Sequence, residues 1–278
     1  MVPKAAISTW TFLDLDLASS LEAAAEAGFS GVEIWAEGAH LDPRRAGPSE
    51  ARAAGALCEK LGLKPVSLHA PFGEGANLGD FDERGRREAV RVVGEAIRYA
   101  RLAGARFVVV HPGSWEGSDD PREHEEFERE VAASLLELSE VARREGVSLL
   151  VENMVPTGRR FRLGAASSDL LRLCRKVPGL AVCFDVGHAN IRPGGERADP
   201  AGEIRALGGL VLSLHLNDND GRGDLHLLPG EGTVDWGEVM RALGEVGYEG
   251  PFLFEVKGGE EALEVARRAA RWLRGWRG

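Results

Sequence analysis

The chain has 278 residues, of which 44% are hydrophobic and 28% charged, and its formal net charge is -10. This composition is typical of a protein with a large apolar core and excludes a membrane-embedded or disordered chain. An acidic balance also disfavours nonspecific coating of nucleic acid, because phosphate contacts need lysine and arginine. No apolar run approaches the ~20 residues of a membrane helix, and the N-terminus lacks a signal-peptide pattern. We therefore expect a cytoplasmic protein with no membrane association.

Short apolar segments recur eight times, and each is followed by a loop and a longer segment of helical periodicity. The predicted strands cover residues 5–10, 31–35, 65–69, 107–111, 148–152, 181–185, 211–215 and 252–255. The predicted helices cover residues 17–27, 50–61, 86–103, 123–145, 167–176, 200–207, 236–246 and 260–272. The strands show little alternation of apolar and polar residues, which is typical of parallel strands covered on both faces.

Regular alternation of strand and helix predicts parallel strands joined by right-handed crossovers. Eight such units predict an α/β protein, specifically a single (β/α)8 TIM barrel that spans residues 1–278. A doubly wound open sheet is the alternative. It is weakened because no strand is followed by a glycine-rich dinucleotide-binding turn or a Walker loop. The glycine- and proline-rich stretches all follow strands, so they are expected to be loops of the catalytic face.

The ends of the predicted strands carry an unusual set of polar side chains. In a barrel the carboxyl ends of all strands converge on one mouth. Buried carboxylates and imidazoles need partners, and their combination favours zinc, manganese, cobalt or iron(II) over calcium. The sequence therefore predicts a metal site. The strand-end residues are Trp10, Glu33, His69, His111, Glu152, Asp185, His215 and Glu255, with His188, Asp224 and His226 in the loops that follow.

Nine short motifs, distributed over the whole chain, resemble those of one superfamily. It is the xylose isomerase-like TIM barrel superfamily, which includes sugar (phosphate) isomerases and epimerases and endonuclease IV, the AP endonuclease family 2. Each motif is weak alone, but their order and spacing are specific. They are GVEIW (31–35), LHAPF (68–72), VHPGS (110–114), VEN (151–153), FDVGH (184–188), LHLND (214–218), DLH (224–226), PGEG (229–232) and LFE (253–255).

The resemblance to the isomerases and epimerases implies one divalent metal (Zn, Mn, Co or Mg) and a small carbohydrate substrate. Glu152 and Glu255 would exchange a proton next to a carbonyl, through an enediolate that the metal stabilises. The implied metal ligands are Glu152, Asp185, His215 and Glu255.

Several further residues are candidates for contacts with a sugar. By resemblance His188 positions the substrate. Arg222 is a looser candidate, for which a solvated loop charge is an equal alternative. Aromatic residues near strand ends could stack on a sugar ring, although ordinary packing explains any one of them equally well. These are Trp10, Trp35, Phe72 and Trp115.

Endonuclease IV offers the alternative function, a zinc phosphodiesterase acting on abasic DNA. Its three zinc ions would be held by His69, His111 and Glu152, by the four ligands given above, and by His188, Asp224 and His226. Against this function, the first strand lacks the pattern of that family and the loop after His69 has no basic run. We therefore expect one metal, with three as the alternative, and nucleic acid is disfavoured but not excluded. A non-catalytic barrel that binds a small molecule or a metal, and a homo-oligomer, also remain open.

Overall fold

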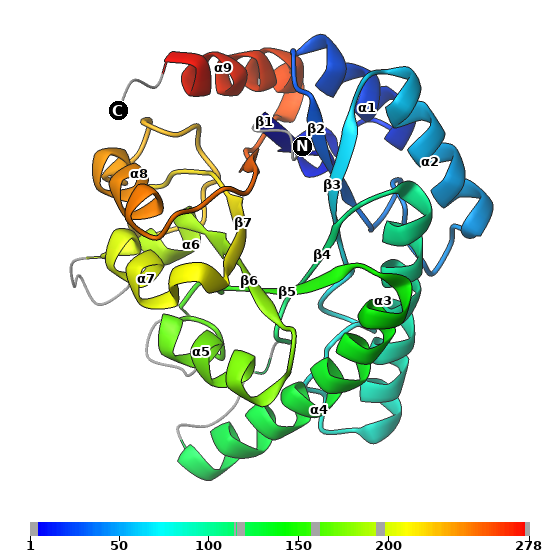
Figure 1. The fold of residues 1–278 in the computed structure, drawn as a ribbon, viewed down its shortest axis with the longest axis vertical. Coiled ribbons are helices and arrows are strands. Elements are labelled where there is room, and N and C mark those ends of the chain that lie inside the picture. Colours follow the sequence, from blue (N-terminus) through cyan, green and yellow to red (C-terminus); the bar gives the residue numbers. More distant parts are fainter. Residues whose placement is uncertain (1–4, 114, 116–119, 157–161, 193–197, 276–278) are drawn as a thin grey trace.

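The computed structural model describes residues 5–113, 115, 120–156, 162–192 and 198–275. Eight parallel strands form one sheet in the order β7-β6-β5-β4-β3-β2-β1-β8 (Figure 1). The predicted (β/α)8 barrel is confirmed. The strands are β1 (Ala5–Ser8), β2 (Gly31–Trp35), β3 (Lys64–His69), β4 (Phe107–Val110), β5 (Ser148–Glu152), β6 (Ala181–Asp185), β7 (Val211–His215) and β8 (Phe252–Phe254).

The barrel closes between β7 and β8, the two ends of this order. Leu216 and Phe254 form a parallel bridge just beyond β7. The amide of Leu216 donates to the carbonyl of Leu253 at 2.8 Å, and the amide of Glu255 donates to the carbonyl of Leu216 at 3.2 Å. This junction brings the end of β8 beside the ends of β6 and β7.

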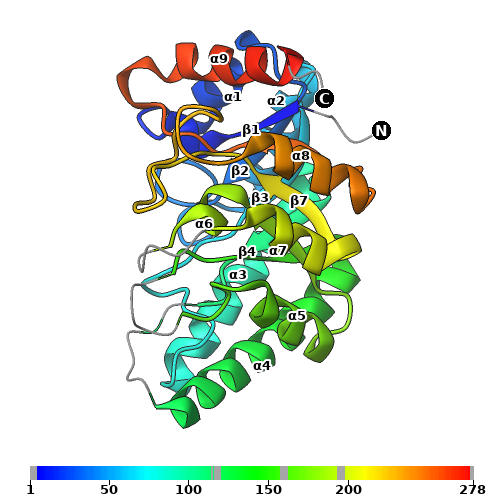
Figure 2. The same ribbon diagram turned by 90° about the vertical axis from the view of Figure 1, so that its left-hand side faces the viewer.

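The helices surround the strands, from α9 and α1 at the top of the view in Figure 2 to α4 at the bottom. Within the described ranges, no helix is long and apolar enough to cross a membrane. The helices are α1 (Leu17–Glu26), α2 (Pro48–Lys60), α3 (Glu83–Ala103), α4 (Pro121–Glu145), α5 (Ser167–Lys176), α6 (Val186–Asn190), α7 (Pro200–Leu207), α8 (Trp236–Glu245) and α9 (Ala262–Gly275), with 3₁₀ turns η1 (Thr9–Phe12), η2 (Gly208–Leu210) and η3 (Gly259–Glu261).

The side-chain alternation of the strands divides the core into two parts and positions the site. In β5, Leu149 and Val151 pack in the large cluster shared with the helices, whereas Leu150 packs in a small cluster inside the barrel. Since alternate residues of a strand share a face, Glu152 lies on the same face as Leu150. Its carboxylate therefore enters the barrel interior at the mouth.

Helix ends agree with local sequence signals. Gly104 and Gly146 follow α3 and α4 with φ of 82° and 71°, the left-handed conformation of a glycine cap. α2 begins at Pro48, two residues before the predicted start, because proline suits the first helical turn. α4 likewise begins at Pro121, where Asp120 accepts a hydrogen bond from the amide of Arg122.

Three strands are shorter than predicted, and one helix was not expected. β1 ends at Ser8 because the chain turns into η1, where the Ser8 side chain accepts a hydrogen bond from the amide of Trp10. β4 and β8 each end one residue early, so that His111 and Glu255 lie just beyond their strands. The extra helix, α6, begins directly after β6, where the Asp185 side chain accepts a hydrogen bond from the amide of His188.

Candidate metal centre

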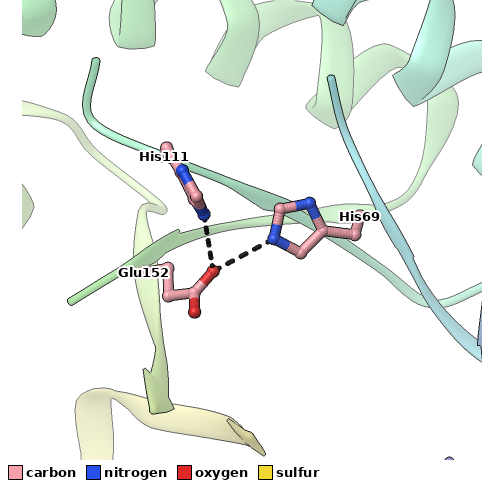
Figure 3. A group of neighbouring side chains, drawn as sticks. All are labelled: His69, His111 and Glu152. Atoms are coloured by element: carbon pink, nitrogen blue, oxygen red, sulfur yellow. Dashed lines mark hydrogen bonds and ion pairs between the residues drawn. The ribbon is translucent and has the colours of Figure 1, made fainter. Parts of the chain in front are cut away.

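Glu152 stands at the centre of the barrel mouth and is 1% exposed. His69 Nε2 lies 3.1 Å and His111 Nε2 lies 3.2 Å from its Oε2 atom (Figure 3). Its other oxygen, Oε1, lies 3.0 Å from His215 Nδ1. Histidines from β3, from β7 and from the position after β4 therefore converge on the carboxylate at the end of β5. His69, His111 and Glu152 form the first group whose ligand atoms lie within 4.8 Å of one another.

A second group is formed by Glu152, Asp185, His215 and Glu255, all buried, with ligand atoms within the same 4.8 Å. His215 Nδ1 is 3.6 Å from Glu255 Oε2 and 3.9 Å from Asp185 Oδ2. Three carboxylates this close together repel one another, and a bound cation would relieve that repulsion. The donor set of imidazole nitrogen and carboxylate oxygen fits zinc, manganese or cobalt.

The third group consists of His188, Asp224 and His226. Asp224 lies between the two imidazoles, with Oδ2 at 3.4 Å from His188 Nε2 and Oδ1 at 3.2 Å from His226 Nε2. The backbone of His226 has a φ of 47°, and its carbonyl accepts a hydrogen bond from the amide of Lys257 at 2.9 Å. The loop after β7 is thus attached to the segment after β8, which brings the third group beside the second.

These three groups contain nine different residues, and they are the same three sets that the resemblance to endonuclease IV implies. Their chemistry fits up to three divalent cations. The first and second groups share Glu152, which contacts His69 and His111 through Oε2 and His215 through Oε1.

Buried polar residues behind the second group orient its side chains. The sequence analysis placed Glu33 at the mouth, but Glu33 lies two residues before the end of β2 and is fully buried. Ser67 and Asn217 were not identified. His215 Nε2 is 3.2 Å from Glu33 Oε1, while Ser67 donates a hydrogen bond of 2.7 Å to Glu33 Oε2. Asn217 donates a hydrogen bond of 2.7 Å to Asp185 Oδ2. The position of Asn217, two residues after His215, was an available signal because alternate residues of an extended chain share a face. Such outer contacts fix the orientation of metal ligands.

The pKa values of the carboxylates differ within the site. Burial raises the pKa of Asp185 and of Glu255, more than the neighbouring histidines lower it. Burial opposes ionisation of Glu152 too, but contacts with His215, His111 and His69 outweigh it and hold the Glu152 pKa well below its usual range.

The histidines also differ in protonation. Burial lowers the pKa of His111 to about 4, so this imidazole is neutral and ready to act as a ligand. Burial acts in the same sense on His188 and His226, but nearby carboxylates outweigh it and raise their pKa values to about 10 and about 9. A metal binding to these two residues must displace protons.

A cavity of about 240 Å³ opens at the three groups. Of the predicted aromatic residues, Trp10, Trp35 and Phe72 line it, whereas Trp115 packs against Phe127 with ring centroids 5.7 Å apart. Arg222 is exposed and is not among the described lining residues, while Arg162, which the sequence analysis did not single out, is. The full lining comprises Trp10, Trp35, His69, Phe72, His111, Glu152, Met154, Val155, Arg162, His188, Asp224, His226 and Glu255.

A closed parallel barrel with imidazoles and carboxylates at its carboxyl end defines the class of protein. The chain belongs to the xylose isomerase-like TIM barrel family, whose model matches residues 21–276.

Proteins similar to this chain include some named as sugar 3-epimerases and one named as an endonuclease. The chain is 27% identical over 235 residues to fructoselysine 3-epimerase of Shigella flexneri (82% of this chain and 80% of the relative). It is 34% identical over 211 residues to endonuclease 4 of Thermus thermophilus (74% and 72%). The solved structure of a D-tagatose 3-epimerase-like protein superposes with a TM-score of 0.82 at 28% identity, covering 98% of this chain and 97% of the other.

Proposed function

We propose that this protein is a divalent-metal-dependent sugar isomerase or epimerase in which Glu152 and Glu255 transfer the proton. One observation carries the proposal. Among the four residues of the second group, the two glutamates line the cavity, whereas Asp185 and His215 are not among its described lining residues. The carboxylates of Glu152 and Glu255 are therefore available to a substrate, whereas Asp185 and His215 would serve only as metal ligands. The relatives named as 3-epimerases support this proposal.

Glu152, Asp185, His215 and Glu255 are the residues that would hold the metal. When bound, a divalent cation supplies Lewis-acid stabilisation of negative charge on the substrate oxygens. One of the two glutamates removes a proton from the carbon next to the carbonyl, and the other supplies a proton. Delivery to the opposite face of the same carbon inverts its configuration. Delivery to the former carbonyl carbon, with a hydroxyl proton passing between the two oxygens, moves the carbonyl instead. Glu152 reaches the cavity from β5 and Glu255 from the end of β8, so that the two carboxylates approach the substrate from different strands.

The walls of the cavity support a carbohydrate substrate. Trp10 packs on His226 with ring centroids 4.5 Å apart, and Trp35 packs on His69 at the same distance. Phe72 stacks on His111 with ring centroids 4.1 Å apart. Each aromatic ring is thus held beside one of the candidate ligands, where it excludes water and offers an apolar surface to the carbon face of a sugar.

The test is deuterium exchange in the metal-loaded protein. Neutral ketohexoses are incubated with the protein in heavy water, and mass spectrometry measures the deuterium incorporated at carbon. We expect incorporation in the wild type and a loss of about 10²–10⁴-fold in Glu152→Gln and in Glu255→Gln, since a general base is removed. Glu249→Gln, at an exposed position, is the matched control. Near-normal exchange in either active-site variant would show that the two-glutamate mechanism is wrong.

A zinc phosphodiesterase acting on abasic DNA is the second candidate. The observation that favours it is the presence of all three ligand groups, together with the similarity to endonuclease 4. A multinuclear zinc site can supply hydroxide and stabilise a leaving oxygen. Three zinc ions per chain with nicking of an abasic duplex, and no carbon-bound deuterium in any ketose, would replace the first proposal. Metal or polyol binding without either reaction would identify a non-catalytic barrel.

A further inference from the structure

Arg162 is the cationic side chain of the cavity that neither the metal groups nor the proton transfer uses. It lies between β5 and α5, is half-buried, and lines the same cavity as Glu152 and Glu255. Its guanidinium donates a hydrogen bond of 3.3 Å from Nη1 to the carbonyl of Val155. This guanidinium therefore faces the space where a substrate would bind.

The backbone beside Arg162 is anchored to the barrel. Leu163 is 1% exposed, and the amide of Met154 donates to the carbonyl of Gly164 at 3.0 Å. Gly164 has a φ of 88°, a conformation that favours glycine, and a Cβ atom there would make a tight contact of 3.1 Å with Pro112. Its amide donates to Asp169 at 3.1 Å. These contacts fix the position from which the Arg162 side chain extends.

The donors of Arg162 are largely available for a ligand. A guanidinium has five N–H donors, and within the parts of the chain that the structure describes it makes the one hydrogen bond to Val155 and no ion pair with a carboxylate. Burial lowers the pKa of Arg162, more than the charges of Asp224 and Glu152 raise it. Both of those carboxylates belong to the metal groups. A half-buried cation of this kind is stabilised by an anionic partner.

We propose that Arg162 binds an anionic group of the substrate, so that the preferred substrate is a ketose carrying a phosphate monoester or a carboxylate. A planar guanidinium matches either group through two parallel hydrogen bonds. This inference rests on the proposed function, because it places the ketose in the cavity of Glu152 and Glu255.

The experiment measures binding to the metal-loaded full chain by the fluorescence of its tryptophans, since Trp10 and Trp35 line the cavity. The ligands are D-fructose, D-fructose 6-phosphate and D-fructuronate. We expect one of the two anionic sugars to bind at least about tenfold more tightly than D-fructose, a factor that corresponds to 1.4 kcal/mol. The preferred anion then distinguishes the phosphate from the carboxylate.

Variants assign the preference to Arg162. We expect Arg162→Gln to lose the preference while binding D-fructose as the wild type does, and Arg162→Lys to retain part of it because the charge stays and the forked geometry is lost. Arg175→Gln removes the same charge from an exposed position at the end of α5 and is the matched control. Circular dichroism and the unfolding midpoint of each variant verify the fold, and the lysine variant decides if the glutamine variant fails to fold.

Three results would overturn the inference. They are equal binding of neutral and anionic sugars, an undiminished preference in Arg162→Gln, and Arg162-dependent binding of an abasic duplex without any sugar preference, which would assign the contact to a nucleic-acid phosphate. Deuterium exchange separates this inference from the proposed function. Exchange of D-fructose that is unaffected in a variant without anion preference leaves the function standing, whereas an Arg162-dependent preference without any exchange leaves only the binding contact.

Discussion

The two ring nitrogens of His215 face different environments. Nε2 lies 3.2 Å from Glu33 inside the barrel, and Nδ1 lies 3.0 Å from Glu152 at the mouth. A carboxylate at Nε2 holds the proton on that nitrogen and leaves the lone pair of Nδ1 directed toward the metal ligands. Glu33 is held in place in turn by the hydroxyl of Ser67. If the second group holds a metal, its affinity should therefore depend on Glu33, which is not one of the four ligands.

We predict that Glu33→Gln weakens metal binding by about 10–100-fold, because loss of an outer carboxylate releases the orientation and lowers the basicity of the ligating imidazole. Competition with a chelator of known affinity measures the change. Glu22→Gln, on the exposed face of α1, is the control and should bind as the wild type does. Unchanged affinity in Glu33→Gln would mean that His215 is oriented without Glu33.

The sequence predicted the residues of the site that end strands and missed those that support them. His69, Asp185 and His215 end apolar runs, so their position at the mouth follows from the fold. The role of Glu33 depends on which strand lies beside β2 and on which side chain of β3 meets it, here Ser67. Arg162 depends on the path of a loop that is fixed by tertiary contacts. Neither of these follows from periodicity.

The short helix α6 packs so closely against the segment after β7 that a side chain larger than hydrogen does not fit at Gly187. A Cβ atom at Gly187 would lie 1.7 Å from Oδ1 of Asn217, the residue that donates a hydrogen bond to Asp185. The side-chain nitrogen Nδ2 of Asn219 donates a hydrogen bond of 2.8 Å to the carbonyl of Gly187. Glycine at this position therefore allows α6 and the residues behind the metal groups to pack closely.

We predict that Gly187→Ala lowers the free energy of unfolding by about 1–3 kcal/mol, the usual cost of overpacking, and weakens metal binding because Asn217 must move. Urea unfolding and chelator competition measure the two effects. Gly94→Ala is the matched control, since a Cβ atom there meets nothing within 4 Å. That change in the middle of α3 should raise the free energy of unfolding by about 0.5–1 kcal/mol.

His40 links the first two βα units away from the metal groups. Its Nδ1 is 3.1 Å from the hydroxyl of Thr9, which also accepts a hydrogen bond from the amide of Trp35. Its Nε2 is 3.1 Å from the carbonyl of Leu15. Burial lowers the pKa of His40, more than Leu15 and Asp16 raise it. The folded protein therefore favours the neutral form of the His40 imidazole.

The depressed pKa gives a pH dependence of known sign. Above the unfolded-state value of about 6.5 the contribution of His40 to stability is complete, and it is lost as the pH falls toward the lower folded-state pKa. We predict that His40→Gln is less stable than the wild type by about 1 kcal/mol at pH 8, through lost hydrogen bonds, and that this difference shrinks at pH 5. Denaturant unfolding of both metal-free proteins across this range checks it, and a constant difference would contradict it.

Among the residues that the structure describes, all eight strands and eight of the helices were predictable, because each strand is a short apolar run and each of these helices follows a pattern of helical periodicity. The exceptions are short. α6 has five residues and begins at Asp185, which the sequence places at the end of a strand. η1 depends on the side chain of Ser8, which accepts the hydrogen bond that turns the chain. One local hydrogen bond determines each of these elements, and hydrophobic periodicity carries no information about it.

For the whole molecule, binding of the proposed metal would change both the stability and the net charge. The formal net charge is -10, and each divalent ion makes it less negative by two. We predict that a chelator lowers the melting temperature and that added metal restores it, because a ligand that binds only the folded state stabilises it by about 2.7 kcal/mol at a free concentration of 100 times its Kd. Calorimetry measures the shift, and native mass spectrometry counts one ion or three. A chelator-insensitive melting temperature would contradict a metal centre.

The residues of the second metal group lie on both sides of the junction that closes the barrel. In the described part of the chain, one parallel bridge, Leu216 with Phe254, joins β7 to β8. Asp185 and His215 lie on one side of this junction and Glu255 on the other. An ion held by all three would cross-link the two edges of the sheet. Hydrogen exchange at the amide of Glu255, which donates to Leu216, should then slow on metal loading far more than exchange within the β4–β5 ladder. A metal bound for catalysis would then also stabilise the closure of the barrel.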